Sequence, residues 1–203
     1  MMNLTSSGRL RNKRLIIIAL IHQDVYVAKI TENNGAITYG APFAVKGAVS
    51  LNVDPEGGDA TPFYADNIVY YMAPGVNNGY SGDLELAITP DEFLTQILGQ
   101  EKDADGVVYE NSNDTNARFA LLFQAQGDTN NRRFCFYDCT AARPSRENNT
   151  KEDTITPGTE TISITMNPRT TDHMVKCYID QTEDNTAIYN AWFSAVHERT
   201  ASI

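Results

Sequence analysis

The sequence contains little of the chemistry on which enzymes and metal sites depend. None of its three histidines pairs with a cysteine or a carboxylate at the spacing of metal ligands. It has no G-x-S-x-G motif, no phosphate-binding Walker loop and no G-x-G-x-x-G motif. We therefore expect no catalytic residue, no metal site and no cofactor. The many carboxylates leave a glycosidase-type pair open as an alternative, although nothing in the sequence singles out two of them.

Cysteine is also sparse, with Cys135, Cys139 and Cys177 the only three. A small, odd number argues against a disulfide framework and fits a reducing compartment. Cys135 and Cys139 are four residues apart on an expected strand, which separates them by about 13 Å at ~3.3 Å per residue. That distance is too long for a disulfide. We expect the cysteines to act as small buried apolar side chains.

Long apolar runs are missing too. The run at residues 15–21 (LIIIALI) follows basic residues but spans only seven positions. A membrane-spanning helix needs roughly 20 apolar residues. The run continues into His22 without the small-residue cleavage site of a signal peptide. It is predicted to form a strand or an ordered arm that packs on a neighbour, and no membrane contact is expected.

Positive charge is scarce outside the N-terminus. The formal net charge is −10, and residues 1–14 hold four cations and no acid. The remaining chain carries 12 Lys and Arg against 26 Asp and Glu, a balance of −14. Such a surface repels nucleic acid and does not bind it non-specifically.

Alternating apolar and polar residues dominate the rest of the chain. With 203 residues and 41% apolar content, the sequence predicts an N-terminal arm over residues 1–23 and one domain over residues 24–203. The predicted fold is mainly β, an antiparallel β-sandwich or partly open barrel with one or two flanking short α-helices. Strands are expected at 24–30, 36–39, 44–53, 61–73, 83–88, 119–126, 133–140, 159–166 and 173–179, and helices at 89–99 and 185–197. The segments 54–59, 74–78 and 141–158 are expected to be loops.

The helix expected at residues 89–99 has a defined start and end. Thr89 is the expected N-cap, Pro90 follows at the first helical position, and Glu92 completes a T-x-x-E capping box. Gly99 supplies the C-terminal stop. The apolar stripe expected to pack this helix on the sandwich consists of Phe93, Leu94, Ile97 and Leu98.

An ordered set of short segments extends over most of the chain, from about Asp24 to about His197. The segments are 63–67 (FYADN), 79–82 (GYSG), 84–87 (LELA), 90–93 (PDEF), 97–99 (ILG), 105–107 with Glu110, 119–123 (FALLF), 139–145 (CTAARPS), 150–155 (TKEDTI) and 189–193 (YNAWF). This set resembles the major tail proteins, or tail tube proteins, of long-tailed phages that infect Gram-positive bacteria. Residues 1–23 depart from the family pattern, because they are basic and then strongly apolar.

The resemblance implies a structural virion protein with the phage tail tube fold. Six copies would close into a ring, and stacked rings would form the hollow tube that conducts DNA into the host. The implied partners are further copies of the chain, a tape measure protein inside the lumen before ejection, and tail terminator and distal tail proteins at the ends. Double-stranded DNA would pass without specific binding. The implied location is the virion tail, assembled in the host cytoplasm.

This resemblance directs attention to two groups of residues. A lumen lined by acids offers DNA no cation to pair with. Candidate lumen-facing residues are Asp83 and Glu85, and equally the uncharged Thr161, Ser163 and Thr165. The loop at 141–158 is longer than a hairpin needs, so with the N-terminal arm it is expected to bridge adjacent rings. The candidates within it are Arg146, Glu147, Asn148, Asn149, Lys151 and Glu152.

A β-sandwich module for virion adhesion or carbohydrate binding is the alternative function. It would need an exposed aromatic platform, and the conceivable members are Tyr64, Tyr70, Tyr71 and Tyr80.

Overall fold

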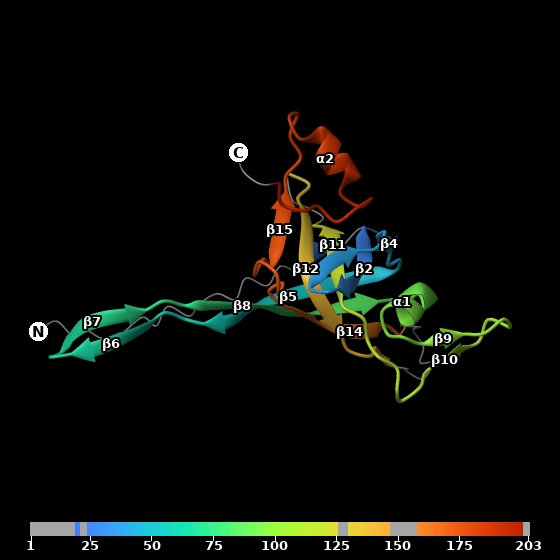
Figure 1. Ribbon diagram of the computed structural model, residues 1–203, viewed down its shortest axis with the longest axis horizontal. Coiled ribbons are helices and arrows are strands. Elements are labelled where there is room, and N and C mark those ends of the chain that lie inside the picture. Colours follow the sequence, from blue (N-terminus) through green and yellow to red (C-terminus); the bar gives the residue numbers. More distant parts are fainter. Residues whose placement is uncertain (1–18, 21–23, 126–129, 147–157, 201–203) are drawn as a thin grey trace, which may run out of the picture.

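Antiparallel β-structure makes up most of the molecule, as the sequence predicts. The computed structural model describes residues 19–20, 24–125, 130–146 and 158–200. Within these ranges an 11-stranded sheet forms the body, and two short helices, α1 (Asp91–Gln96) and α2 (Thr186–Ala191), lie beside it (Figure 1). The sheet has free ends at β1 and β3 and does not close into a barrel.

The sheet is assembled from strands that are distant in sequence. Its order is β1 (Ala19–Leu20), β5 (Ala48–Gly58), β8 (Val76–Leu86), β14 (Glu160–Met166), β12 (Arg133–Ala141), β11 (Phe119–Gln124), β2 (Val25–Asn33) and β3 (Ala36–Tyr39). In addition, β13 (Ser145–Arg146) pairs with β14, β15 (Lys176–Ile179) with β12, and β4 (Phe43–Ala44) with β2. Two small hairpins complete the described structure: β6 (Thr61–Ala65) with β7 (Ile68–Ala73), and β9 (Glu101–Lys102) with β10 (Val108–Tyr109).

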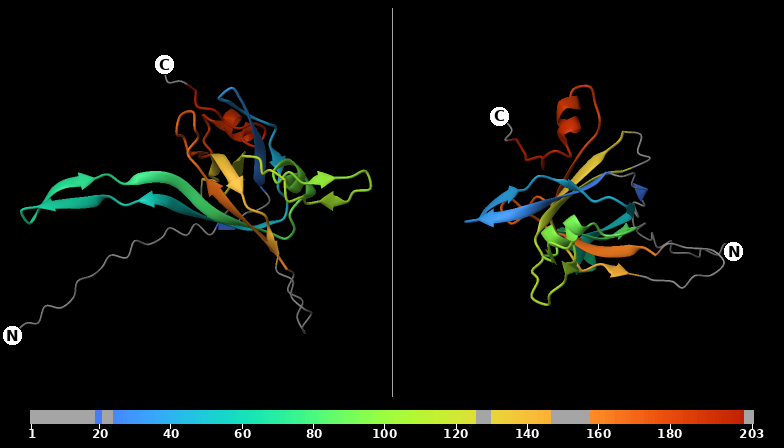
Figure 2. Two further views of the ribbon diagram at one scale, coloured as in Figure 1. Left: turned by 60° about the horizontal axis from the view of Figure 1, so that its bottom comes forward. Right: turned by 90° about the vertical axis from the view of Figure 1, so that its right-hand side faces the viewer.

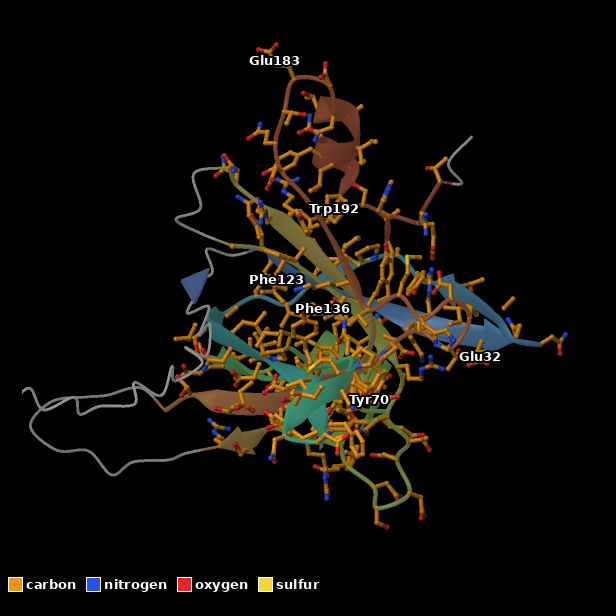
Figure 3. The ribbon with its side chains drawn as sticks, turned by 90° about the vertical axis from the view of Figure 1, so that its left-hand side faces the viewer. Glu32, Tyr70, Phe123, Phe136, Glu183 and Trp192 are labelled. Carbon is orange, nitrogen blue, oxygen red and sulfur yellow. The ribbon has the colours of Figure 1, made fainter. Side chains whose placement is uncertain are left out.

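Strand β12 joins the two halves of the large sheet. Its first residues pair with β15, where Cys135 lies opposite Cys177, and its last residues pair with β14, where Thr140 lies opposite Thr165. Both halves contribute side chains to one main core, so the sheet folds over on itself (Figure 2). Phe123 and Phe136 lie inside this core with ring centroids 6.1 Å apart (Figure 3).

A second, smaller core lies on the other face of β11 and β12. It contains Ala28, Ala120, Leu122, Cys135, Tyr137 and Trp192. Trp192 follows α2 directly and covers the sheet there, and its indole N–H donates a 3.3 Å hydrogen bond to the Phe134 carbonyl (Figure 3). Strand β11 is therefore buried on both faces, as its burial pattern shows, and the strand expected at residues 119–126 is confirmed over Phe119–Gln124.

The two longest strands, β5 and β8, extend beyond the body as an arm that ends in the β6–β7 hairpin (Figures 1 and 2). We define the arm as residues 56–79, because the last β8–β14 pair is Tyr80 with Met166, and the arm tip as residues 61–73. The expected loops at 54–59 and 74–78 are wrong, since most of these residues continue the β5–β8 ladder.

The single strand expected over residues 61–73 is also wrong, because the chain reverses in its middle. Asp66 and Asn67 have φ angles of +50° and +62°. Asp and Asn tolerate this left-handed region better than other non-glycine residues, which allows a tight hairpin turn.

Gly79 stands where the arm leaves the body. Its φ is +105°, and a Cβ atom on it would lie 2.1 Å from the Met166 carbonyl oxygen. No side chain fits at this distance, so only glycine allows β8 to pass this close to the end of β14.

The capping box predicted for α1 is wrong. The N-cap is Pro90, which makes no side-chain capping bond. The Thr89 backbone N–H donates a 2.8 Å hydrogen bond to Glu160 Oε2 on β14, while the Glu92 carboxylate accepts one from the Gln96 side chain. Glu160 of β14 therefore accepts the hydrogen bond from the Thr89 N–H that Glu92 was expected to accept. Gly99, with φ of +76°, follows the helix as predicted.

The second helix is shorter than the expected range of residues 185–197. Asn185 is its N-cap, but the Asn185 amide oxygen accepts from the Thr182 N–H and makes no bond to the helix. After α2 the chain turns at Trp192 and runs on as a non-helical segment across the second core.

Candidate assembly surfaces

The β5, β8 and β14 strands carry a continuous polar surface on the side away from the main core. Successive side chains of a strand point to opposite sides, so one side holds the buried apolar residues and the other holds polar ones. Leu84, Leu86 and Ile162 are among the buried residues. The polar face, as we call it, consists of Ser50, Asn52, Asp54, Ser81, Asp83, Glu85, Thr161, Ser163 and Thr165.

The candidate lumen residues predicted as two alternatives lie side by side on this polar face. Asp83 is directly opposite Ser163, and Glu85 is directly opposite Thr161. Thr165 is opposite Ser81 one step further along the ladder. Directly opposed residues of an antiparallel pair share a side of the sheet. The acids of β8 and the hydroxyls of β14 therefore form one surface.

Hydroxyl groups hold the carboxylates of this face in place. Ser163 Oγ donates to Asp83 Oδ1 at 2.7 Å. Ser50 Oγ and Thr159 Oγ1 donate to the two oxygens of Glu85 at 2.9 and 2.8 Å. Such charge-assisted hydrogen bonds fix the position of a carboxylate while its negative charge stays uncompensated.

The polar face also lacks positive charge. Strands β5, β8 and β14 contain no lysine and no arginine in their sequences. Beside them on β13, Arg146 lies 3.6 Å from Glu160 Oε1, an acid that is largely buried and belongs to the core side. The part of this surface formed by the described strands is therefore acidic and offers no cation of its own to an anionic polymer.

Most of the candidate inter-ring residues lie outside the described residues. Arg146 is placed on β13, whereas Glu147, Asn148, Asn149, Lys151 and Glu152 are not described. Of the predicted N-terminal arm, Ala19 and Leu20 form β1, which pairs with β5 at Leu51 and Ser50. A strand is thus confirmed at these two positions of the apolar run.

The helix-packing residues lie against the main core. Phe93, Ile97 and Leu98 are buried in it, and Leu94 packs against it from a half-exposed position. The Phe93 ring contacts Phe119 edge to face, with centroids 5.9 Å apart. Helix α1 therefore closes one end of the body.

The arm tip exposes apolar side chains on both of its faces. Phe63 lies opposite Tyr71 on one face, and Tyr64 lies opposite Val69 on the other. Ile68, opposite Ala65, shares the face of Phe63, and Met72, opposite Pro62, shares the face of Tyr64. Tyr70 is the extra residue where the register shifts between these pairs. All seven side chains are 50% to 75% exposed. Within the described part of the chain, β6 and β7 pair only with each other.

The four tyrosines considered for an aromatic platform do not lie together. Tyr64 and Tyr71 lie on opposite faces of the arm tip, and Tyr70 is the unpaired residue of the β7 bulge. Tyr80 belongs to the body, where its ring contacts Phe136 at 5.3 Å and lies under the Lys176 ammonium. A single platform of all four rings is therefore wrong.

Neither the polar face nor the arm tip carries an arrangement of side chains typical of a reactive centre. Over the described ranges, no group of three or more His, Cys, Asp and Glu side chains is placed to hold a metal ion. Among those same residues, both helices are too short to cross a membrane.

No protein-family model matches the sequence, and no curated protein matches it. Among solved structures, the chain is similar to one chain of the cryo-EM structure of the anti-feeding prophage (AFP) baseplate, 6-fold symmetrised. The two share 8% identity over 79% of this chain and 95% of that chain, with a TM-score of 0.37. A match this distant carries no conclusion about function.

Proposed function

We propose that this chain is the structural subunit of a phage tail tube, assembling into stacked hexameric rings that conduct DNA into the host. The single observation that carries the proposal is the arm tip, which is apolar on both faces and far from its own body. The sequence resemblance to major tail proteins supports the same function.

The arm tip needs a partner for physical reasons. A two-stranded hairpin is marginally stable by itself in water. Burying a large apolar side chain contributes roughly 1.5–3 kcal/mol, and neither face of the tip obtains this from its own body. A partner that encloses both faces would supply it. When a projecting element of one copy binds a different surface on the next, the contact is head-to-tail and generates rings or filaments.

The polar face supports the second half of the proposal, the passage of DNA. In a closed ring this face would line the lumen. Its carboxylates repel phosphates, and the Ser50 and Ser163 hydroxyls are already engaged with those carboxylates, so DNA would find no cation at which to stick. The tape measure protein would occupy the same lumen before ejection, and tail terminator and distal tail proteins would cover the tube ends.

The loop at residues 147–152 and the N-terminal arm are proposed to bridge adjacent rings. Deleting residues 147–152 should abolish tube formation and leave a soluble monomer. Tubes of normal length from this deletion would contradict the bridging role while leaving the role of the arm tip untouched.

Negative-stain electron microscopy of the purified protein tests the main proposal. The wild type should form hollow rods or rings of one width. The double substitution Ile68→Ser with Tyr71→Ser, on one face of the arm tip, should abolish them and leave folded monomers. The matched control is Ile88→Ser with Tyr109→Ser, which removes the same residue types from exposed positions on the body. Equal assembly of both variants, or a monomeric wild type, would overturn the proposal.

A second function is favoured by one specific observation, the exposed aromatic pair Phe63 and Tyr71, directly opposite each other on one face of the arm tip. Exposed aromatic rings on one surface can stack on sugar rings, as a carbohydrate-binding adhesion module requires. This reading predicts monomers that bind host polysaccharide, with affinity lost in Tyr71→Ser and retained in Tyr64→Ser, which changes the other face.

A further inference from the structure

Two of the three cysteines lie directly across from each other on adjacent strands. Cys135 on β12 is the register partner of Cys177 on β15. Two residues further along the same ladder, the Tyr137 N–H donates to the Val175 carbonyl. Hydrogen-bonded pairs recur at every second residue of an antiparallel ladder, so Cys135 and Cys177 also form a hydrogen-bonded pair. In such pairs the Cα atoms are about 5.5 Å apart, within the range that a disulfide spans. Spacing along the sequence draws attention only to Cys135 with Cys139, because the partner of Cys135 across the ladder lies on a different strand.

The two thiols differ in burial and in reactivity. Cys135 is fully buried in the second core, while Cys177 is partly exposed at its edge. A hydrogen bond from the Cys135 thiol, and the Tyr137 hydroxyl 3.1 Å from Cys177 Sγ, lower the pKa of Cys177. Burial and Glu198 raise this pKa and Arg169 lowers it, and the net direction is downward. Partial exposure and stabilisation of the thiolate are the conditions under which a cysteine reacts with oxidants.

We propose that Cys135 and Cys177 form a redox clip, which a peroxide closes into a disulfide that ties the edge strand β15 to β12. Cys177 is the attacking thiolate and Cys135 the resolving thiol. The clip would stay open in a reducing compartment and close in an oxidising one. This inference does not depend on the proposed function.

The chemistry balances with hydrogen peroxide as the oxidant. The Cys177 thiolate attacks one peroxide oxygen, the O–O bond breaks, and the leaving hydroxide takes a proton to become water. Cys177 is then a sulfenic acid. The Cys135 sulfur attacks the Cys177 sulfur, the S–O bond breaks, and the hydroxide leaves as water with the Cys135 proton. Two thiols are oxidised to one disulfide and one peroxide is reduced to two waters.

Cys139 provides an internal control. It is fully buried in the main core, and burial raises the pKa of its thiol far above the ordinary value. It lies opposite Phe119 and Met166, so no cysteine faces it across the ladder. It should remain a thiol while the other two react.

The test uses the full chain, folded, with millimolar hydrogen peroxide. After unfolding with the free thiols blocked, chymotrypsin cuts beyond Phe136 and Tyr137, which separates Cys135 from Cys139. The wild type should give one linked peptide pair containing Cys135 and Cys177, with Cys139 blocked as a thiol. A link through Cys139, a disulfide between two chains, or three unreacted thiols would overturn the clip.

Three substitutions assign the roles of the two sulfurs. Cys139→Ala should keep the link. Cys135→Ala should lose it and accumulate a sulfenic acid at Cys177 that dimedone traps, and Cys177→Ala should give neither product. Dimedone labelling at Cys135 in Cys177→Ala, at a rate equal to that of Cys177 in Cys135→Ala, would overturn the assignment of the attacking thiol. If a variant does not fold, the wild-type peptide map alone still decides whether the clip forms.

Discussion

The Ser163 hydroxyl donates a 2.7 Å hydrogen bond to Asp83 Oδ1 across the β14–β8 ladder. The two residues are 80 positions apart in sequence and directly opposite in the sheet. This contact joins the acids of one strand to the hydroxyls of another and makes a single acidic surface of them. Its consequences for DNA passage can be tested without changing the core, because the side chains involved lie on the solvent side.

Reversing the charge of the polar face should slow DNA ejection and spare assembly. In the double substitution Asp83→Lys with Glu85→Lys, the proposed lumen gains cations that bind phosphates. Tubes should still form, and the rate of DNA release from virions, followed with an intercalating dye, should fall several-fold. The control is Glu101→Lys with Asp105→Lys, which makes the same charge change on the β9–β10 hairpin. Equal ejection rates in the two variants would contradict a lumenal polar face.

Removing the Thr89 hydroxyl should not destabilise the protein. Thr89 Oγ1 is buried without a hydrogen-bond partner, so Thr89→Val should leave the free energy of unfolding unchanged or raise it. A capping role would instead cost about 1 kcal/mol. Urea unfolding of the two proteins distinguishes these outcomes.

The Glu160 carboxylate should contribute to the free energy of unfolding, whereas the Thr89 hydroxyl should not. Glu160→Ala leaves the buried Thr89 N–H without its acceptor, which should cost about 1–3 kcal/mol of unfolding free energy. The comparison is Glu92→Ala, which removes the carboxylate that the capping box requires. A larger loss of unfolding free energy in Glu92→Ala than in Glu160→Ala would support the capping box against the Glu160 contact.

The Arg118–Asp138 pair should be the most costly ion pair to break. Asp138 is 3% exposed and binds both the Nε and Nη2 groups of Arg118. Asp138→Ala removes the main partner of Arg118, which is partly exposed and keeps Glu32, and should cost about 1.5–3 kcal/mol. The outer partner of the same arginine, Glu32, is exposed, and Glu32→Ala should cost about 0–1 kcal/mol. Urea unfolding should rank the two variants in this order.

Local signals predict the body better than the arm. Asn33-Asn34-Gly35 indicates the β2–β3 hairpin, and alternation over β14 identifies its buried face. Residues 61–73 are apolar on both faces, a pattern typical of a strand buried inside its own domain. The structure places them far outside it, so the partner that would bury them is not encoded in local sequence. The split pairing of β12 and the Glu160–Thr89 contact are likewise long-range and leave no local pattern.

Acid should weaken the fold through the contact between Arg169 and Asp172. Arg169 is 5% exposed, lies 4.7 Å from the Tyr137 ring centroid, and donates to Asp172 and to Glu198 near the C-terminus. The hydrogen bond from Arg169 is the main cause that lowers the pKa of Asp172. A carboxyl group with a lowered folded-state pKa stabilises the protein above its unfolded pKa of about 3.9 and loses this contribution as the pH falls further.

Asp172→Asn should therefore reduce the difference in urea midpoint between pH 6 and pH 3. It should lower the midpoint mainly at pH 6, where the wild-type carboxylate is charged. The control, Asp105→Asn, changes an exposed carboxyl group and should keep the wild-type difference. An Asp172→Asn variant with the full wild-type pH dependence would mean that the Arg169 contact contributes nothing to acid sensitivity.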